Sequence, residues 1–403
     1  MQVVGTVPPA QVEHDVSRSR GPLGRNMADE TEAGETTRTG RGHHIAGSSA
    51  HSSRNRAWLI ALVSAVVVLA LAGVSLALTA GTKSTRLAAT PSTAATSGAS
   101  CPLSGVPAAG GQVPQRPALA IKVDNYPSAR PQSGLDKADI VFEEPVEGGI
   151  TRLVAVFQCQ SANLVGPIRS ARAVDAPILD QLSKPLFVHV GGIKPVLSRV
   201  SEADLLDENL PANGSVVQNP PGRYAPYDTY VSTAAGWELH PSDTNPPASI
   251  FTYSPTTPSG TPVTSVHIPY SQTNDVTWKW DTNIGHWMLY YSGNPATVAN
   301  SGQIAVPNIV VQTVQITYGP WVESQGALEV QSQLTGSGPL RVFRNGLEVT
   351  GTWQRSSLDS PTRLVASDGS TIALEPGETW VELVPTSIAV TTTTPSSPSS
   401  TSG

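Results

Sequence analysis

The sequence has few charged residues and no excess of basic ones. Only 14% of its 403 residues are charged, whereas soluble domains average about 25%. The 25 Lys and Arg residues are outnumbered by 31 Asp and Glu residues, which gives a formal charge of −6. A nucleic-acid-binding protein normally presents a basic face. We therefore expect no nucleic-acid partner.

The sequence also lacks the common catalytic motifs. It has no G-x-S-x-G elbow, no S-x-x-K followed by K-T-G, and no P-loop. The four His residues beyond position 100 show no metal-binding spacing, and zinc needs three or four convergent ligands. We therefore predict no metal and no cofactor. Whether the protein is an enzyme stays open, and the missing motifs favour a protein without catalytic activity.

One long apolar run is present, at residues 57–80, and it contains no charge. About 20 apolar residues span a bilayer. Arg54 and Arg56 precede the run, which predicts an N-terminus inside the cell and a body outside it. A cleaved signal peptide is the alternative, but its apolar core would be about 7–15 residues long. We favour an uncleaved, single-pass signal anchor in the cell membrane.

Composition divides the rest of the chain. Residues 1–56 predict a disordered cytoplasmic tail, residues 81–116 a flexible stalk, and residues 386–403 a disordered Ser/Thr/Pro tail. Between them, residues 117–247 read as a mixed α/β domain and residues 248–385 as a smaller β-rich domain. The predicted fold class is therefore α+β, behind one N-terminal transmembrane helix.

Apolar periodicity places individual elements. Strands are predicted at 118–123, 138–142, 150–157 and 186–190, and helices at 172–182 and 194–206. Residues 276–281 and 286–291 predict a hairpin. Asn345-Gly346 and Asp368-Gly369 predict two further hairpin turns.

The two cysteines, Cys101 and Cys159, both follow the predicted anchor. Thiols outside the cytoplasm tend to oxidise, so we predict a disulfide that fastens the start of the body to the strand ending near Phe157. A catalytic cysteine is disfavoured because no His is placed by sequence to serve it.

Polar residues are densest between positions 122 and 172. Ser170 could cap the predicted helix and leave N–H groups free for an anion, with arginines adding bidentate contacts. Two interpretations stay open: the arginines and carboxylates surround a polar ligand, or they pair with one another to hold loops in place. The candidate ligand-binding residues are Asp124, Arg130, Glu143, Glu147, Arg152, Arg169 and Arg172.

Several long segments resemble the YerB-like lipoprotein family, a bacterial extracytoplasmic domain of unknown function with a smaller C-terminal companion domain. They include RPALAIKVDNYPSARPQSGLDKADIVFEEPVEGGITRLVAVF at 116–157, GPIRSAR at 166–172, GTWQRSSLDSPTRL at 351–364 and PGETWVELVP at 376–385. The resemblance implies a secreted, membrane-tethered protein with two joined domains, and it supplies no reaction. Many relatives carry a lipobox, whereas this sequence predicts a transmembrane anchor.

The sequence thus favours a membrane-anchored binding or scaffolding protein of the bacterial envelope, with a cell-wall polymer or an envelope protein as partner. The alternative is a cell-wall hydrolase that uses carboxylates of the Glu143–Glu147 segment. A third interpretation is a purely structural role, in which the Trp-rich second domain packs against a partner.

Overall fold

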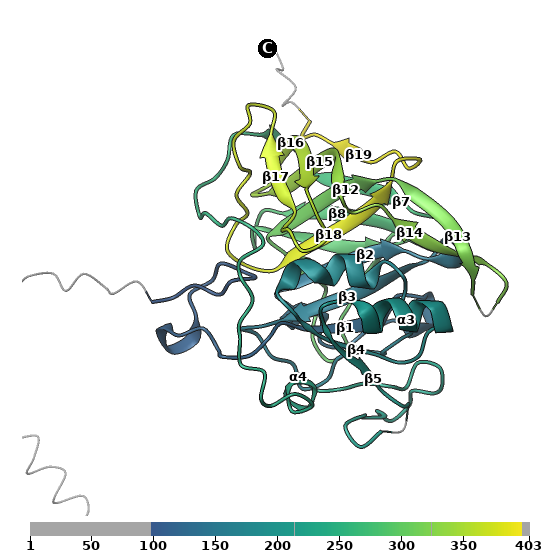
Figure 1. Cartoon of the computed structure of the whole chain (residues 1–403). Helices are drawn as coiled ribbons and strands as arrows, with labels where there is room; N and C mark the ends of the chain where they lie inside the picture. Colours follow the sequence, from purple (N-terminus) through teal and green to yellow (C-terminus); the bar gives the residue numbers. More distant parts are fainter. Residues whose placement is uncertain (1–97, 213, 324, 397–403) are drawn as a thin grey trace, which may run out of the picture. The chain divides into compact units, whose positions relative to one another are not determined.

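The computed structural model describes residues 98–396 except positions 213 and 324 (Figure 1). The predicted cytoplasmic tail, residues 1–56, and the predicted membrane anchor, residues 57–80, lie outside the described residues. Among the residues that the structure describes, no helix is long and apolar enough to cross a membrane.

An eleven-stranded mixed sheet forms the centre of the body, in the order β17-β16-β15-β12-β18-β2-β3-β1-β4-β5, with β6 paired to β16. The first half of the chain supplies β1 (Leu119–Asp124), β2 (Ile140–Pro145), β3 (Thr151–Phe157), β4 (Leu186–His189) and β5 (Leu206–Asn209). The second half supplies β6 (Thr261–Pro262), β12 (Asn308–Val314), β15 (Gly336–Arg344), β16 (Leu347–Arg355), β17 (Arg363–Ala366) and β18 (Thr379–Pro385).

The two halves of the chain are joined within this sheet. Strand β18 runs parallel to β2, in register from Thr379 opposite Ile140 to Glu382 opposite Glu143. In Figure 1 the yellow β18 lies beside the blue β2. Backbone hydrogen bonds therefore cross the boundary that composition predicts at residues 247 and 248.

Smaller sheets complete the β structure. The second sheet contains β7 (Ser265–Pro269), β8 (Asp275–Asp281), β9 (His286–Tyr291), β10 (Asn294–Pro295), β11 (Ala305–Val306) and β19 (Thr391–Thr393). Strands β8 and β9 confirm the hairpin predicted at 276–291. A separate two-stranded hairpin is formed by β13 (Ile316–Val322) and β14 (Leu328–Ser332). Strand β19 lies in the predicted C-terminal tail and pairs with β7.

The helices are short, and the described body is predominantly β-sheet. The α-helices are α2 (Asp175–Leu179), α3 (Lys194–Glu202) and α4 (Thr233–Trp237). The 3-10 turns are η1 (Ala109–Gly111), η2 (Pro127–Ala129), η3 (Leu135–Lys137), η4 (Glu147–Gly149) and η5 (Asp180–Leu182). The α+β class predicted more helix than is present. Helix α2 begins three residues later than expected, because the Asp175 carboxylate accepts the N–H of Arg172 and holds that segment as a turn.

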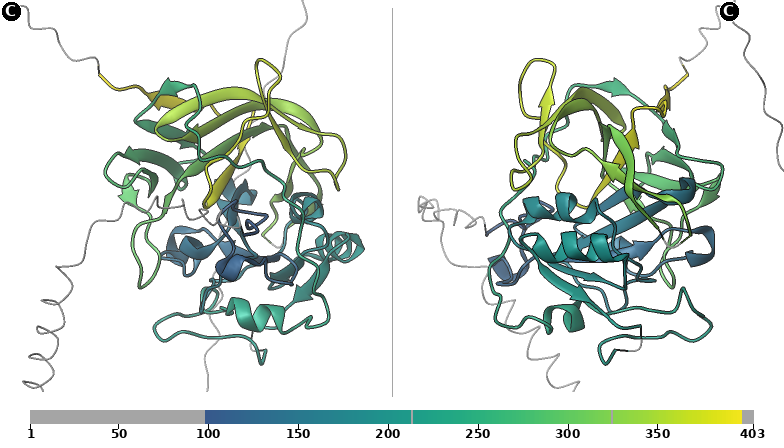
Figure 2. Two further views of the ribbon diagram at one scale, coloured as in Figure 1. Left: turned by 90° about the vertical axis from the view of Figure 1, so that its left-hand side faces the viewer. Right: turned by 45° about the vertical axis from the view of Figure 1, so that its right-hand side comes forward.

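Apolar side chains cover both faces of the large sheet, since side chains alternate along a strand. One face packs on α2 and α3 through residues such as Val154, Ile178 and Val196, and the helices on that face are visible from two sides in Figure 2. The other face packs on the second sheet. Four of the six Trp residues after position 270 are buried: Trp278, Trp287, Trp353 and Trp380. The other two, Trp280 and Trp321, are partly exposed, so the interpretation of a Trp-rich docking domain now depends on these two residues.

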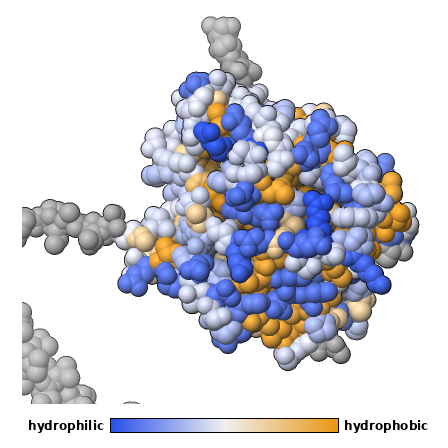
Figure 3. All heavy atoms as spheres, in the orientation of Figure 1, coloured by the Kyte–Doolittle hydropathy of each residue, from blue (hydrophilic) through white to orange (hydrophobic). Residues whose placement is uncertain are grey.

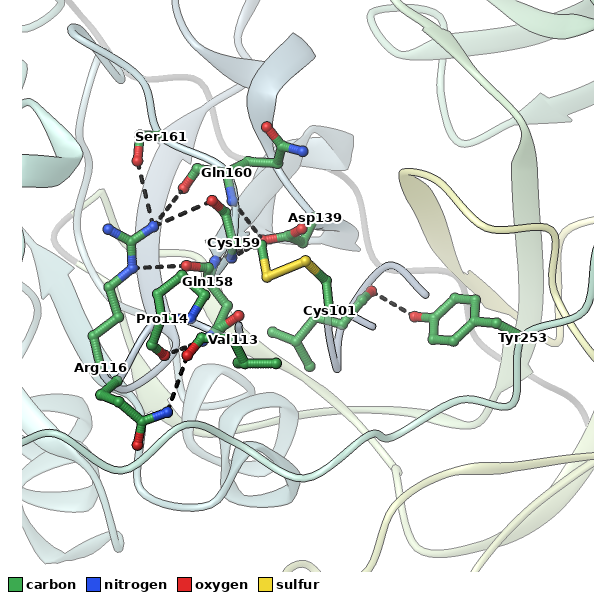
Figure 4. Close-up of a disulfide and its surroundings, with 12 residues drawn as sticks. Cys101, Val113, Pro114, Arg116, Asp139, Gln158, Cys159, Gln160, Ser161 and Tyr253 are labelled. Atoms are coloured by element: carbon green, nitrogen blue, oxygen red, sulfur yellow. Dashed lines mark hydrogen bonds between the residues drawn. A yellow bond between two sulfur atoms is a disulfide. The ribbon is translucent and has the colours of Figure 1, made fainter. Parts of the chain in front are cut away.

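The predicted disulfide is confirmed between Cys101 and Cys159, which lies two residues after the end of β3 (Figure 4). The Asp139 carboxylate accepts the N–H of Gln158 at 2.6 Å and of Cys159 at 3.1 Å, and Arg116 donates to the Gln158 carbonyl at 2.7 Å. Residues 98–116 fall in the predicted stalk, but Cys101 and Leu103 are buried. The described part of that segment therefore packs on the body.

Candidate functional site

A polar cavity of about 520 Å³ opens beside the ends of β1 and β3. We call it the arginine cavity. Its walls come from the end of β1, the η4 turn, the segment 166–172, the loop around Tyr227 and the β13–β14 hairpin. Five of the seven candidate residues predicted from the sequence line it, namely Asp124, Glu147, Arg152, Arg169 and Arg172.

Strand pairing places the first of these residues. Arg152 on β3 is in register with Asp124 on β1 and with Glu144 on β2. Because side chains alternate, Arg152 points to the helix-covered face of the sheet, where Lys122 and Glu144 also lie. Lys122, Glu144 and Asp175 form a fully buried ion cluster there.

The segment 166–172 is held along β1 by its backbone. Asp124 donates its N–H to the carbonyl of Pro167, and Arg169 donates its N–H to the carbonyl of Lys122. Gly166 has φ +150°, and a Cβ there would lie 2.8 Å from the Tyr230 ring and 2.9 Å from the Thr229 carbonyl. Only glycine fits this close approach. Ser170 does not cap a helix, because α2 begins five residues later.

Arg172 is the most heavily paired residue of the cavity. Its guanidinium donates to both oxygens of Glu147, with Nε 2.8 Å from Oε2. Its Nη2 lies 3.4 Å from Glu323, and its Nε lies 4.0 Å from Glu329. Burial opposes ionisation of Glu147, but the hydrogen bonds and charge of Arg172 outweigh it and lower the pKa of that carboxyl. Arg172 thus fastens the η4 turn and the β13–β14 hairpin to the large sheet.

Arg152 is buried but less completely paired. Its Nη1 donates to the Ser170 carbonyl at 3.1 Å, and its Nη2 lies 3.7 Å from Glu147. Its Nε has no hydrogen-bond partner within the part of the chain that the structure describes. Burial, followed by repulsion from Arg172, lowers the pKa of Arg152 to about 10. It stays charged at neutral pH, and a buried cation with a spare donor favours an anionic ligand.

Arg169 lies at the open side of the cavity. Its Nε is 2.7 Å from the Asp124 carboxylate, and its side chain is 28% exposed. Its guanidinium carbon lies 5.8 Å from the centre of the Tyr227 ring. Arg169 is therefore the arginine that an incoming ligand can reach most easily.

Sequence reasoning missed two acids on the hairpin, Glu323 and Glu329. Glu329 accepts the N–H of Ala173 at 2.7 Å. Burial, and then a hydrogen bond with Glu323, raise the pKa of Glu329 to about 8. Both acids lie about 150 positions after Arg172 in the sequence, and they meet it only through the fold.

Two predicted residues, Arg130 and Glu143, lie on the opposite face of the sheet. Glu143 is fully buried and accepts hydrogen bonds from Thr151 at 2.7 Å and Tyr291 at 2.9 Å. Arg130 stacks on the Tyr291 ring at 3.6 Å. The two residues help to join the second sheet to the large one. Neighbours in a strand face opposite ways, so Glu143 and Glu144 could not both have faced one site.

The fold separates the three glutamates on which the hydrolase alternative was based. A glycosidase needs two carboxyl groups that flank the scissile bond at about 5–10 Å. Glu143 and Glu144 are fully buried, and of the three glutamates in the segment only Glu147 lines the arginine cavity. Within the described ranges, no group of three His, Cys, Asp or Glu residues is arranged to hold a metal ion.

Comparisons with known proteins agree with the sequence resemblance. Residues 103–243 match a family described as "Protein of unknown function (DUF3048) N-terminal domain", and residues 266–381 match the C-terminal domain of that family. "Putative lipoprotein YerB" of Bacillus subtilis is 31% identical over 289 residues, which are 68% of this chain and 83% of that protein.

A solved structure supports the same assignment. The crystal structure of the YerB protein from Bacillus subtilis matches with a TM-score of 0.63 and 25% identity, and the match covers 73% of this chain and 99% of that one. This chain therefore belongs to the YerB-like DUF3048 family.

Proposed function

We propose that the protein is a membrane-tethered, extracytoplasmic binding protein of the bacterial envelope. In this proposal the arginine cavity binds an anionic group, a carboxylate or a phosphate, on a cell-wall fragment or another envelope ligand. The cavity acts by binding rather than by catalysis.

The unpartnered Nε of Arg152 carries the proposal. A buried polar group without a hydrogen bond costs free energy, and a charged one costs more. Arg152 lines the cavity and keeps that donor unused among the described residues. Since carboxylates and phosphates accept paired hydrogen bonds from arginine, such a group would supply the missing acceptor.

The pairing of the other charges is consistent with this role. Glu147 is held by Arg172, and Asp124 is held by Arg169. Of the three arginines in the cavity, Arg152 has the longest nearest contact with a carboxylate, 3.7 Å to Glu147. Arg169 can exchange part of its contact with Asp124 for a ligand, because it is partly exposed.

The test is binding of the purified protein to cell-wall sacculi and to soluble wall fragments, at several salt concentrations. Saturable binding that weakens with salt is expected, since salt screens ionic contacts. Arg169→Gln should weaken binding about tenfold, the equivalent of losing one good charge-assisted hydrogen bond. Arg363→Gln, at an exposed position on β17, is the matched control and should bind normally. Equal binding by both variants would contradict the proposal.

A further inference from the structure

A second hollow of about 400 Å³ adjoins the arginine cavity. The two share the wall residues Glu147, Gly148, Ile150 and Ala327. We call this second hollow the apolar groove. It runs between the η4 turn and the β13–β14 hairpin, so a ligand in the cavity has an apolar surface beside it.

The groove is lined mainly by large apolar side chains. They include Val146 and Ile150 on one wall and Ile316, Leu328 and Val330 on the other. Tyr318, also in the lining, is 69% exposed, and Leu328 is 47% exposed. In Figure 3 apolar atoms reach the surface at the right-hand edge of the molecule, where Figure 1 places β13. Grouped apolar exposure beside a polar cavity is typical of a binding surface.

Part of the groove offers a peptide few hydrogen-bond donors. Pro145 and Pro385 have no N–H to offer, and the N–H of Val146 is bonded to the carbonyl of Ile150. The Tyr270 hydroxyl already donates to Glu382 at 3.0 Å. A peptide carbonyl buried against these four residues would find no free donor, at a cost in free energy. A hydrocarbon chain carries no such groups.

We propose that the site takes an anionic amphiphile, a membrane lipid-like molecule with one hydrocarbon chain. Its anionic head pairs with Arg152 and Arg169 in the arginine cavity, and its chain lies in the apolar groove against Ile150 and Leu328. This inference rests on the proposed function, because it names the class of ligand that the same cavity binds.

Photo-crosslinking tests this assignment in the full chain, reconstituted in lipid nanodiscs. The probe is dodecyl phosphate with a diazirine in its chain, and mass spectrometry locates the label. We expect labelling of peptides that cover 145–150 and 316–330. Unlabelled dodecyl phosphate should compete at least about tenfold better than inorganic phosphate, because burial of even two methylenes gives that factor. Dodecyltrimethylammonium should compete poorly.

Variants separate the contribution of the hydrocarbon chain of the ligand from that of its anionic head. Leu328→Asp should reduce labelling at least about fivefold, because it puts a charge in the groove. Arg169→Gln should reduce competition by dodecyl phosphate, and Arg363→Gln should change neither. Labelling spread over the whole surface, or equal competition by the cationic analogue, would overturn the inference.

Two outcomes distinguish this inference from the proposed function. If wall fragments or inorganic phosphate bind in an Arg169-dependent way and a hydrocarbon chain does not increase the affinity, the amphiphile assignment fails and the proposed function stands. If no anion binds with or without a chain, both fail. Stronger displacement of the probe by an apolar peptide with a free carboxyl end would also overturn the assignment of a lipid-like ligand.

Discussion

Removal of the Arg172 side chain tests whether this arginine is a structural fastener. In Arg172→Ala, the buried side chain that holds Glu147 and approaches Glu323 and Glu329 is lost. Loss of one partner from a buried ion pair costs about 3–5 kcal/mol, because the remaining charge stays buried. If Arg172 served only a ligand, Arg172→Ala would leave the melting temperature unchanged. The contacts of Arg172 predict a large destabilisation instead.

The assay is denaturant unfolding of the purified protein, supported by thermal melts. A loss of 3 kcal/mol lowers the melting temperature by roughly 6 °C or more, at about 2–4 °C per kcal/mol for a large domain. The matched comparison is an arginine without a buried partner. Arg169 itself is not suitable for this purpose, because its partner Asp124 is buried. Arg363→Ala, at an exposed position on β17, is used instead and should cost about 0.5 kcal/mol or less.

A double-mutant cycle makes the test specific to the pair. Glu147→Gln combined with Arg172→Ala should destabilise less than the sum of the single changes, with a coupling energy of about 1–3 kcal/mol. If Arg172→Ala costs no more than Arg363→Ala, or if the cycle gives no coupling, Arg172 is not a structural fastener.

Three other changes should have measurable effects. The pKa of Glu329 is raised to about 8 from an ordinary value of 4.5. The folded state therefore binds more protons than the unfolded state between these values, and thermal stability should fall as pH rises from 5 to 9. Glu329→Gln should flatten this fall, and an unchanged slope would refute the raised pKa of Glu329. The disulfide closes a loop of 58 residues. By the chain-entropy relation, replacing Cys101 and Cys159 together by Ala should therefore lower the free energy of unfolding by about 4 kcal/mol. A loss below about 1 kcal/mol in denaturant unfolding would contradict this prediction. Gly166→Ala should lower the free energy of unfolding by about 1–3 kcal/mol, because the new Cβ would press against the Tyr230 ring. Wild-type stability of this variant would show that the segment 166–172 adjusts freely.

Local sequence signals predicted the parts of the fold that depend on local structure. The strands around positions 119–124 and 151–157, the hairpin at 276–291 and the Asn345-Gly346 turn all follow from alternation and turn residues. The disulfide followed from cysteine count and compartment. The pairing of β18 with β2 did not, because nothing local in residues 379–385 specifies a partner about 240 positions earlier.

The same distinction explains the candidate site. Asp124, Glu147, Arg152, Arg169 and Arg172 cluster in the sequence and in the fold, since β1, β3 and the segment after them are neighbours. Glu143 was wrongly grouped with these residues, although the alternation of side chains along β2 already indicated that Glu143 and Glu144 face opposite ways. Glu323 and Glu329 could not have been found from the sequence, because their contact with Arg172 depends on where the β13–β14 hairpin packs.

The most direct test of the central claim is an NMR measurement on the arginine side chains. In protein with ¹⁵N-labelled arginine, the Nε–H signal of Arg152, assigned with Arg152→Lys, is followed during titration with wall fragments, phosphate and dodecyl phosphate. We predict a saturable shift of the Arg152 and Arg169 signals that weakens with salt, while the signal of Arg363 stays in place. If none of these anions moves the Arg152 signal at low salt, the arginine cavity is not an anion-binding site and its arginines serve the fold.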